Sequence, residues 1–583
     1  MLGPISIASE ELRSLVTAAI EKAVEKGELA APADGLPKFL IEQPADPTHG
    51  DFATNAAMAG ARAFRKPPRA IAEAIIANLD LEGTHFDRAE VAGPGFINFF
   101  VSDLWFSEVL TRIIAEGENY GRTDYGKGQK VMVEFVSANP TGPMHMGNAR
   151  GGAIGDGLAA ALDGAGYNVT REFLVNDAGN QIEKFARSLE ARYLQHFKGE
   201  EAVPFPEDGY HGADIIERAE QYIAEHGDDL LNAEETDRKK ALVAFSLPKN
   251  IEKMKADLAR YRIEFDNWFS ETTLHESGAV MRAIDELTKR GYTYEKEGAV
   301  WYKNIEVQTA ALLAQGKTQK QIDLLELKDD VLIRANGFPT YFAADIAYHA
   351  NKFVDREYVK CINIWGADHH GHVARLKCAL DALGVGGDKL DIVLMQLVRL
   401  TSNGELVRMS KRSGKAITLS NLLDDVPIDA ARFFFNMREP GSQLDFDLDL
   451  AVEESKQNPV YYVQYAHARI CSIIKNLAAE GVTAQQLTAE QLNILTHNDE
   501  RELIRTLASF PEEIIAAAKN YDPARLTHFA SEAATRFHKF YDSCHVKCGD
   551  DALMQARLTL CKASEIAIKN VLAMLKIDAP ESM

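Results

Sequence analysis

The chain has 583 residues, 46% of them hydrophobic and 26% charged, and a formal net charge of −22. This length is too great for one hydrophobic core and predicts about three or four domains, and the ordinary composition excludes a disordered chain. The acidic balance excludes general nucleic-acid binding, which needs clustered Lys and Arg, but it is compatible with a local basic patch.

The sequence indicates a reduced, cytoplasmic protein. No apolar run approaches the roughly 20 residues that span a bilayer. The first residues lack the basic and apolar regions of a secretory signal. The six cysteines are dispersed and sparse for this length, which fits a reducing compartment. Cys544, His545 and Cys548 have no second cysteine pair to complete a zinc site, so no metal is expected there.

Residues 1–115 predict a small N-terminal α/β domain. Apolar periodicity indicates helices over 9–26 and 69–77, and a glycine-rich turn before an apolar run indicates a strand within 91–100. Four cations lie within eight residues around the start of the second helix: Arg62, Arg65, Lys66 and Arg69. They fit either a solvated helix end or a surface that contacts phosphate.

Residues 125–455 predict the central domain. Its alternating strands and helices are typical of a parallel sheet with crossover connections. We expect strands over 131–136, 359–365 and 392–400. Charged helices and loops within about 185–330 indicate insertions into this domain.

The first strand of the central domain leads into SANPTGP and then HMGN at 145–148. A strand, a tight loop and a helix start present backbone N–H groups to a phosphate. Gly147 removes a side chain there, and His145 and Asn148 fall on one helix face. The same pattern also fits an ordinary strand-to-helix corner with a surface histidine.

A second polar stretch directly follows the strand expected over 359–365. Gly366 permits the close approach of a ligand, and Asp368 offers a carboxylate to ribose hydroxyls at the edge where parallel sheets bind ligands. Three histidines lie within four residues, namely His369, His370 and His372. Their spacing at a helix start does not converge on one ion, so no metal site is expected.

Asn403-Gly404, between two apolar-rich runs, predicts a two-residue type I′ hairpin. The hairpin leads into RMSKRSGK at 408–415, which includes Met409 and Lys411. Four cations in eight residues, separated by small residues, suit a mobile loop that closes over a polyphosphate. A solvated basic loop is the alternative interpretation.

From 456 to 583, apolar positions recur at helical spacing and predict a C-terminal α-helical bundle. An aromatic and cationic stretch near its start includes Tyr461, Tyr465 and Arg469. Unstacked RNA bases can rest on such rings. Packing in the core of the bundle would use the same aromatic residues.

These motifs resemble the two signatures of class I aminoacyl-tRNA synthetases. HMGN at 145–148 is similar to the His-Ile-Gly-His motif, and RMSKR at 408–412 is similar to Lys-Met-Ser-Lys-Ser. Longer blocks, such as EFVSANPTGPMHMGNARGGA and WGADHHGHVARLK, extend the resemblance to bacterial-type arginyl-tRNA synthetases over essentially the whole chain. Two residues depart from the motifs. Asn148 cannot carry a proton, and Arg408 keeps the charge but changes its geometry.

The resemblance implies an α/β plus α architecture. It has a class I Rossmann-like parallel-sheet catalytic domain with insertions, an N-terminal domain that meets tRNA and a C-terminal anticodon-binding bundle. Catalysis is implied for His145, Asn148 and Lys411. ATP binding is implied for His145, Gly147, Asn148, Gly366, Asp368, His369, Met409 and Lys411. tRNA binding is implied for Arg62, Arg65, Lys66, Arg69, Tyr461, Tyr465 and Arg469.

Arginine is the implied amino acid, and its guanidinium is best met by carboxylates. Glu134 lies in an otherwise apolar strand, where an unpaired carboxylate is costly. Tyr341 and Asp345 would share one face of a helix that Thr340 caps. Asp345 could instead simply complement the helix dipole. The resemblance implies arginine binding by Glu134, Asn139, Tyr341 and Asp345.

The implied reaction converts ATP and L-arginine to arginyl-adenylate and pyrophosphate, and the 3′-terminal adenosine of tRNA(Arg) then takes the arginyl group. Mg²⁺ would accompany ATP, held mainly by phosphates and water. The resemblance also implies a monomer whose adenylate formation needs bound tRNA. Two alternatives stay open: a class I synthetase for another amino acid such as cysteine, and a non-catalytic tRNA-binding protein on the same scaffold.

Overall fold

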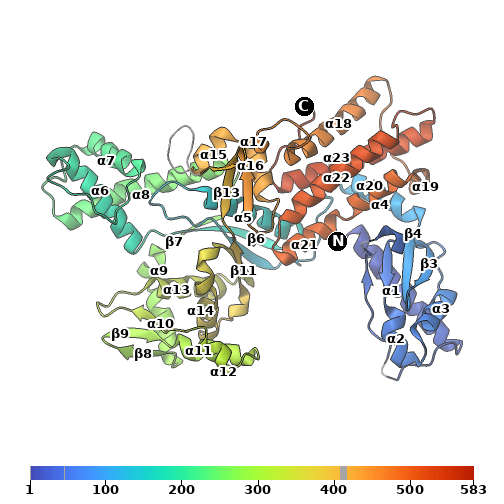
Figure 1. Ribbon diagram of the computed structural model, residues 1–583, viewed down its shortest axis with the longest axis horizontal. Coiled ribbons are helices and arrows are strands. Elements are labelled where there is room, and N and C mark those ends of the chain that lie inside the picture. The colour runs from blue at the N-terminus through green and yellow to red at the C-terminus, as the bar shows by residue number, and fades with distance from the viewer. Residues whose placement is uncertain (1, 34, 45, 408–416) are drawn as a thin grey trace.

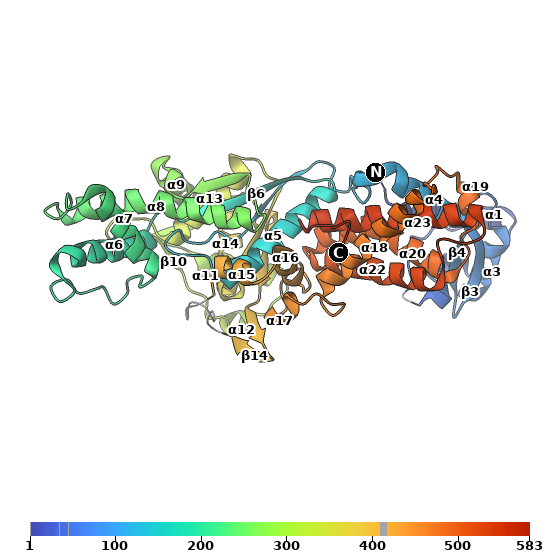
Figure 2. The same cartoon turned by 90° about the horizontal axis from the view of Figure 1, so that it is seen from above.

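The computed structural model describes residues 2–33, 35–44, 46–407 and 417–583. Figure 1 shows an elongated molecule with a central sheet, a helical lobe (α6–α8) at one end, and the C-terminal helices and N-terminal unit at the other. Figure 2 shows the same order from above, so these parts follow one another along the long axis. Among the described residues, none of the helices has a hydrophobic stretch that would reach across a bilayer.

Five parallel strands form the central sheet, in the order β12-β11-β5-β6-β7. They are β5 (Lys130–Glu134), β6 (Asn168–Val175), β7 (Asn267–Ser270), β11 (Lys360–Gly366) and β12 (Leu390–Met395). The chain runs from β5 outward through β6 to β7, and from β11 outward to β12, so the order reverses between β5 and β11. Ligands bind beyond the carboxyl ends of parallel strands at such a reversal. The predicted Rossmann-like sheet is confirmed.

Helix α5 (Met146–Gly164) follows β5 and approaches the sheet through small residues. A Cβ atom on Gly155 would come 2.2 Å from the Phe135 ring, and one on Gly152 would come 2.7 Å from the Ile263 side chain. Glycine at these positions lets the helix pack closely. Close packing fixes the start of α5 at the carboxyl end of β5.

The continuous strand predicted over 392–400 is wrong. The chain leaves the main sheet after β12 and enters a three-stranded sheet of order β14-β13-β15. Its strands are β13 (Val398–Ser402), β14 (Glu405–Val407) and β15 (Leu444–Asp447). At the break, the buried Arg150 guanidinium donates a hydrogen bond to the Gln396 carbonyl oxygen at 2.7 Å. In a continuous strand, this carbonyl oxygen would instead accept a hydrogen bond from a neighbouring strand.

The type I′ hairpin predicted at Asn403-Gly404 is confirmed. Ser402 pairs with Glu405, which leaves a two-residue turn. Asn403 and Gly404 have positive φ angles of 53° and 75°, as this turn requires. The basic segment 408–416 that follows β14 lies outside the described residues.

Two lobes are inserted into the sheet domain, and β7 returns the chain to the main sheet between them. The region 185–330 therefore holds more than the charged helices and loops expected from the sequence. The first lobe packs α6 (Asn180–Lys198), α7 (Ala213–His226) and α8 (Glu235–Arg260) around its own apolar core.

The second lobe combines short helices with a small antiparallel sheet, β10-β9-β8. Its helices and strands are α9 (Thr272–Glu276), α10 (Ala279–Lys289), β8 (Thr293–Lys296), β9 (Ala299–Tyr302), α11 (Asn304–Ala314), α12 (Gln319–Asp323) and β10 (Asp330–Ile333). Helices α13 (Tyr341–Val354) and α14 (His370–Ala382) pack against this lobe and flank β11 in sequence.

The N-terminal unit is a small α/β domain, as predicted. Its antiparallel sheet has the order β1-β2-β4-β3. The strands are β1 (Ile41–Glu42), β2 (Phe52–Thr54), β3 (Phe86–Ala92) and β4 (Phe96–Val101). The helices are α1 (Pro4–Glu25), α2 (Ala56–Phe64) and α3 (Pro68–Asn78).

The C-terminal part of the chain is helical, as predicted. The connecting helices are α15 (Leu419–Asp425), α16 (Ile428–Phe435) and α17 (Leu448–Ala451). The bundle holds α18 (Pro459–Ala479), α19 (Ala489–Leu492), α20 (Asn498–Ala508), α21 (Phe510–Asn520), α22 (Ala524–Ser543) and α23 (Asp551–Met574). Helix α4 (Asp103–Glu116) follows the N-terminal sheet and packs against α19, α20 and α23.

Asp156, fully buried on α5, joins the sheet domain to the C-terminal helices. It accepts hydrogen bonds from Arg432 of α16 at 2.5 Å, from Arg171 of β6 at 3.1 Å and from Lys576 after α23 at 3.2 Å. Burial opposes ionisation, but the three cations outweigh it and lower the pKa of Asp156. The carboxylate is therefore ionised at neutral pH.

Replacing Asp156 with Ala should destabilise the protein by about 3–5 kcal/mol, because the buried Arg432 guanidinium would lose its carboxylate. Thermal unfolding followed by circular dichroism should show a lower midpoint. Arg399→Ala is the matched control, since the exposed Arg399–Asp445 pair should contribute only about 0–1 kcal/mol. Equal shifts in the two variants would contradict the structural role of Asp156.

Candidate active site

The HMGN motif forms the corner between β5 and α5. Val136 and Ser137 turn the chain out of β5 with positive φ angles of 67° and 38°. His145 is the N-cap residue of α5, and its backbone N–H donates to the Asn148 side-chain oxygen at 3.0 Å. Burial lowers the pKa of His145, so its imidazole is neutral at neutral pH. The corner thus presents backbone N–H groups and a neutral imidazole.

The residues that follow the undescribed segment 408–416 lie against this corner. His145 forms an isolated antiparallel bridge with Thr418, and the Leu419 N–H donates to the Met144 carbonyl at 2.8 Å. Two of the predicted nucleotide-binding residues, Met409 and Lys411, belong to segment 408–416 outside the described residues. The chain nevertheless re-enters the described structure beside His145.

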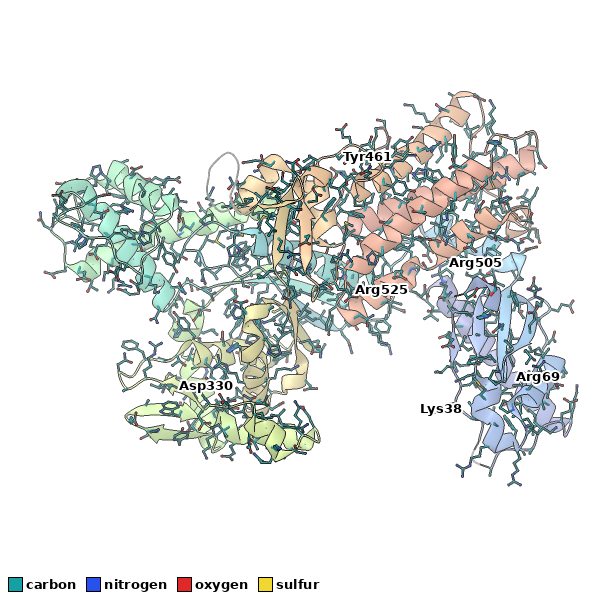
Figure 3. The ribbon with its side chains drawn as sticks, in the orientation of Figure 1. Lys38, Arg69, Asp330, Tyr461, Arg505 and Arg525 are labelled. Carbon is teal, nitrogen blue, oxygen red and sulfur yellow. The ribbon has the colours of Figure 1, made fainter. Side chains whose placement is uncertain are left out.

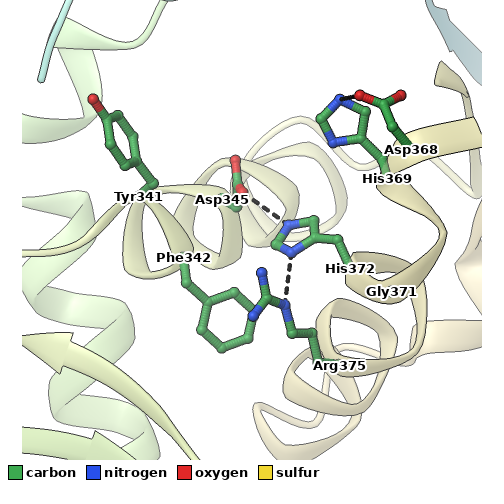
Figure 4. Close-up of a pocket in the computed structure, with 8 residues that line it drawn as sticks. All are labelled: Tyr341, Phe342, Asp345, Asp368, His369, Gly371, His372 and Arg375. Carbon is green, nitrogen blue, oxygen red and sulfur yellow. Dashed lines mark hydrogen bonds and ion pairs between the residues drawn. The ribbon is translucent and has the colours of Figure 1, made fainter. Parts of the chain in front are cut away.

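A cavity of about 550 Å³ opens near the carboxyl end of β11. Its lining includes predicted arginine-binding residues, Tyr341 and Asp345, and predicted nucleotide-binding residues, Asp368 and His369. Figure 4 shows these side chains around one space, with both sets reaching it from α13 and from the turn after β11. The structure therefore brings two residues of each predicted set to one cavity.

Asp345 is held by a chain of hydrogen bonds on one side of the cavity. His372 Nε2 donates to Asp345 Oδ2 at 2.9 Å, and Arg375 Nε donates to His372 Nδ1 at 2.8 Å (Figure 4). Because Arg375 occupies Nδ1, a neutral His372 carries its proton on Nε2. Arg375 is in turn paired with Asp330 at 2.7 Å. The contacts orient the Asp345 carboxylate without fully neutralising it.

Glu271 is a further acid, close enough to Asp345 to feel its charge, that sequence reasoning missed. It is buried directly after β7, and its pKa is raised to about 7 by burial, by Asp345 and by Asp177. Asp177 accepts from the Thr272 N–H at 2.9 Å and so fixes the turn that carries Glu271. The four-residue strand β7 gave no sequence signal, and without it Glu271 resembles any acid in a charged region. The imidazole Nε2 of His275 lies 3.7 Å from Glu271 Oε1.

Glu134 forms a buried ion pair instead of opening freely to the cavity. Lys352 of α13 donates to Glu134 Oε2 at 2.5 Å, and the Ser137 hydroxyl donates to Oε1 at 3.2 Å. Lys352 also binds Asn363 Oδ1 at 3.3 Å. The carboxylate predicted to need a partner thus has one, supplied by a lysine that lies 218 residues later in the chain.

Tyr341 contacts the first residues of α6, and Asn139 contacts the connection that leads to α6 from β6. The Tyr341 hydroxyl accepts hydrogen bonds from the backbone N–H groups of Asn180 and Gln181, the latter at 3.3 Å. Asn139 Oδ1 accepts from Asn176 Nδ2 at 3.1 Å. These contacts tie the loop after β5, the start of the first inserted lobe and α13 together.

The predicted nucleotide residues after β11 lie on an exposed turn. Asp368 and His369 are 82% and 60% exposed, and their side chains lie 3.7 Å apart. A Cβ atom on Gly366 would come 2.4 Å from Asp368 Oδ1, so glycine allows the carboxylate to fold back over the end of β11. Both polar side chains are thus available at the edge of the sheet.

The predicted tRNA-binding residues fall on two separate surfaces. Arg62, Arg65, Lys66 and Arg69 are all exposed around the connection between α2 and α3. Figure 3 shows Arg69 on the N-terminal unit and Tyr461 on α18, far apart along the molecule. The Tyr461 and Tyr465 rings are parallel within 5°, with centroids 6.5 Å apart, and Arg469 lies over the Tyr541 ring at 4.1 Å.

Family models cover most of the chain. They describe an arginyl tRNA synthetase N terminal domain over residues 10–101, a tRNA synthetase class I (R) catalytic domain over 109–452 and a DALR anticodon binding domain over 463–583. Together with the parallel sheet and its nucleotide corner, these matches define a class I aminoacyl-tRNA synthetase.

Full-length relatives narrow the class further. The arginine–tRNA ligase of Acetivibrio thermocellus is 53% identical over 583 residues, 100% of each chain, and that of Caldanaerobacter subterraneus is 52% identical over 99% of each. The chain therefore belongs to the arginine–tRNA ligase family. The crystal structure of a putative arginyl-tRNA synthetase from Campylobacter jejuni, 29% identical, matches with a TM-score of 0.71 over 83% of this chain and 100% of that one.

Proposed function

We propose that this chain activates L-arginine with ATP and transfers it to the 3′-terminal adenosine of tRNA(Arg). The observation that supports this most directly is the cavity of about 550 Å³ that Asp345 shares with Asp368 and His369. An acidic pocket beside groups suited to ribose and phosphate fits the condensation of a cationic amino acid with ATP.

The acids of the pocket favour a guanidinium. The raised pKa of Glu271, about 7, results from its burial and from the nearby charges of Asp345 and Asp177. A bound guanidinium would offset that repulsion and would offer a planar fork of donors to the carboxylates. The neutral side chain of cysteine would leave them uncompensated, which argues against the alternative amino acid.

The four proposed arginine-binding residues take different roles. Tyr341 and Asp345 line the cavity and would contact arginine directly. Asn139 would act from the loop after β5, where its side-chain oxygen already holds Asn176. Glu134, buried against Lys352 and hydrogen-bonded to Ser137, would position this loop through the contact to Ser137.

In the activation step, a carboxylate oxygen of arginine attacks the α-phosphorus of ATP. The new P–O bond makes the adenylate, and the bond to the bridging oxygen breaks to release pyrophosphate. Negative charge grows on the phosphate, so the N–H groups at the start of α5 and the Lys411 ammonium would act mainly in the transition state. ATP would enter with Mg²⁺ held by its phosphates and water.

His145, Gly147 and Asn148 would form the ATP corner. A neutral His145 can donate a hydrogen bond to phosphate without adding charge. Asn148 uses its side-chain oxygen on the His145 N–H, so its amide nitrogen is the group that would face the nucleotide. The replacement of a second histidine by asparagine thus keeps a donor and gains a cap for α5.

The two tRNA surfaces would contact different parts of one tRNA. The exposed cations at Arg62, Arg65, Lys66 and Arg69 suit backbone phosphates. The parallel rings of Tyr461 and Tyr465, with Arg469 nearby, suit unstacked anticodon bases. We propose functional units at 1–115, 125–455 and 456–583. We also propose a monomer in the cytoplasm, where the six cysteines would stay reduced as they are here.

Aminoacylation with radiolabelled arginine and total tRNA tests the function. We expect arginine to be esterified to tRNA, and cysteine in the same assay to give background. Pyrophosphate exchange should be near background until tRNA is added, as the family resemblance implies. Robust exchange without tRNA would contradict only the requirement for bound tRNA. Failure to charge any tRNA with arginine would contradict the proposed function.

Replacing Asp345 with Asn should raise the KM for arginine roughly 10- to 100-fold and leave that for ATP nearly unchanged, since one charge-assisted bond to the guanidinium is lost. Asp445→Asn, in an exposed ion pair, is the matched control. Parallel increases for arginine and ATP would weigh against guanidinium recognition.

The affinity for arginine should rise as the pH increases through about 7, where Glu271 loses its proton in the free protein. The sign follows because a guanidinium favours the ionised form of an acid whose pKa is raised. Steady-state kinetics between pH 6 and pH 8 in wild type and Glu271→Gln provide the measurement. An unchanged pH profile in the variant would show that Glu271 is not the titrating group.

Lys411→Ala should lower kcat by roughly 100- to 1,000-fold with little change in the KM for arginine, because its ammonium acts on charge that develops in the transition state. Exchange of labelled pyrophosphate in the presence of tRNA measures this step. Lys240→Ala, an exposed lysine of the first inserted lobe, is the control. Wild-type turnover of Lys411→Ala would remove the proposed role.

A further inference from the structure

Three metal-binding side chains meet between α18 and α23, away from the catalytic cavity. His467 and Cys471 lie one helical turn apart on α18, and Glu565 lies on α23, which packs against α18. One ligand atom of each residue lies within 4.8 Å of the other two. Residues four apart on a helix share a face, so both α18 ligands are directed to the same place.

The imidazole of His467 is already oriented as a metal ligand would be. The residue is 2% exposed, and its ring Nδ1 lies 2.9 Å from the carbonyl oxygen of Pro580. A carbonyl only accepts, so Nδ1 carries the proton, and the lone pair of Nε2 has the Cys471 thiol as its recorded contact. A hydrogen bond from the second ring nitrogen to a carbonyl is the usual support of a metal-bound histidine.

The two other ligands have suitable positions. Cys471 is a free thiol whose Sγ lies beside the His467 ring, 3.8 Å from Nδ1 and 4.0 Å from Nε2. Glu565 binds the Lys562 ammonium at 2.6 Å through Oε2, and among the described residues Oε1 takes no hydrogen bond. One nitrogen, one sulfur and one oxygen ligand thus converge from two helices and are partly screened from solvent.

We propose that His467, Cys471 and Glu565 form a binding site for Zn²⁺. Histidine nitrogen, cysteine thiolate and carboxylate oxygen are the three kinds of ligand that Zn²⁺ takes, and water would complete the tetrahedron. On binding, Cys471 would release its thiol proton to solvent as the Zn–S bond forms. The Glu565 oxygen remote from Lys562 would be the third ligand.

The ion would hold the segment around Pro580 against the bundle. It would join α18 to α23 and strengthen the His467 contact to Pro580, because metal binding increases the polarity of the Nδ1–H bond. Tyr461 and Tyr465 lie on the same helix, six and two residues before His467. The site would therefore stabilise the helix that carries these aromatic residues without taking part in aminoacylation.

Cobalt titration of the chelator-treated full chain tests the proposal. Co²⁺ takes the same ligands as Zn²⁺ and gives a thiolate charge-transfer band and strong tetrahedral d–d bands. We expect one equivalent of Co²⁺ with these features, displaced by one equivalent of Zn²⁺. Wild-type protein that binds no Co²⁺, or binds it without a thiolate band, would overturn the site.

Variants assign the ligands. Cys471→Ser should abolish the charge-transfer band, and Glu565→Gln should weaken Co²⁺ binding roughly 10- to 100-fold. Cys548→Ser, in the same bundle, is the matched control and should titrate like wild type. Loss of the band in Cys548→Ser instead would place the thiolate elsewhere and overturn the proposal.

A second measurement distinguishes loss of metal binding from misfolding of the variants. Zn²⁺ should raise the thermal midpoint of wild type and of Cys548→Ser, because a ligand that binds the folded state stabilises it. Cys471→Ser should keep the helical circular dichroism of wild type and show no such rise. An equal rise in Cys471→Ser would also overturn the site.

Discussion

The buried carboxylate of Asp156 is the contact on which the arrangement of the molecule depends. It lies on α5, the helix whose first residues form the nucleotide corner, and binds cations from β6, α16 and the segment after α23. A buried charge is tolerated only with well-placed partners. The position of α5 is therefore set jointly by the sheet and by the C-terminal helices. The corner at the start of α5 is thus held in place by contacts to both.

The acids in and near the site differ in whether a cation neutralises them. Glu134 is neutralised by Lys352 in the interior. Glu271 is buried among other acids, so its pKa is raised to about 7. The buried acid of β5 is thus paired with a cation, whereas the acid directly after β7 has other acids nearby. On the proposed function, that contrast, more than the net charge of the chain, would favour a cationic substrate.

Local signals in the sequence predicted the parts of the fold that local chemistry decides. The strand-loop-helix at HMGN, the strand before Gly366 and the Asn403-Gly404 turn follow from apolar runs and turn residues. Contacts between residues far apart in the sequence could not be predicted from it. Lys352 reaches Glu134 over 218 residues, and the short edge strand before Glu271 carries no alternating pattern. The break after β12 likewise depends on Arg150, far away in sequence.

The wide separation of the partners of Asp156 has a consequence for how the protein is made. During synthesis α5 emerges long before Arg432, which lies 276 residues later, and Lys576, which lies 420 residues later. Until those cations arrive, the helix has a charged group that resists burial. Asp156 therefore has only its near partner Arg171 until the C-terminal helices are made, and a nascent chain that stalls early should expose this helix to chaperones and proteases.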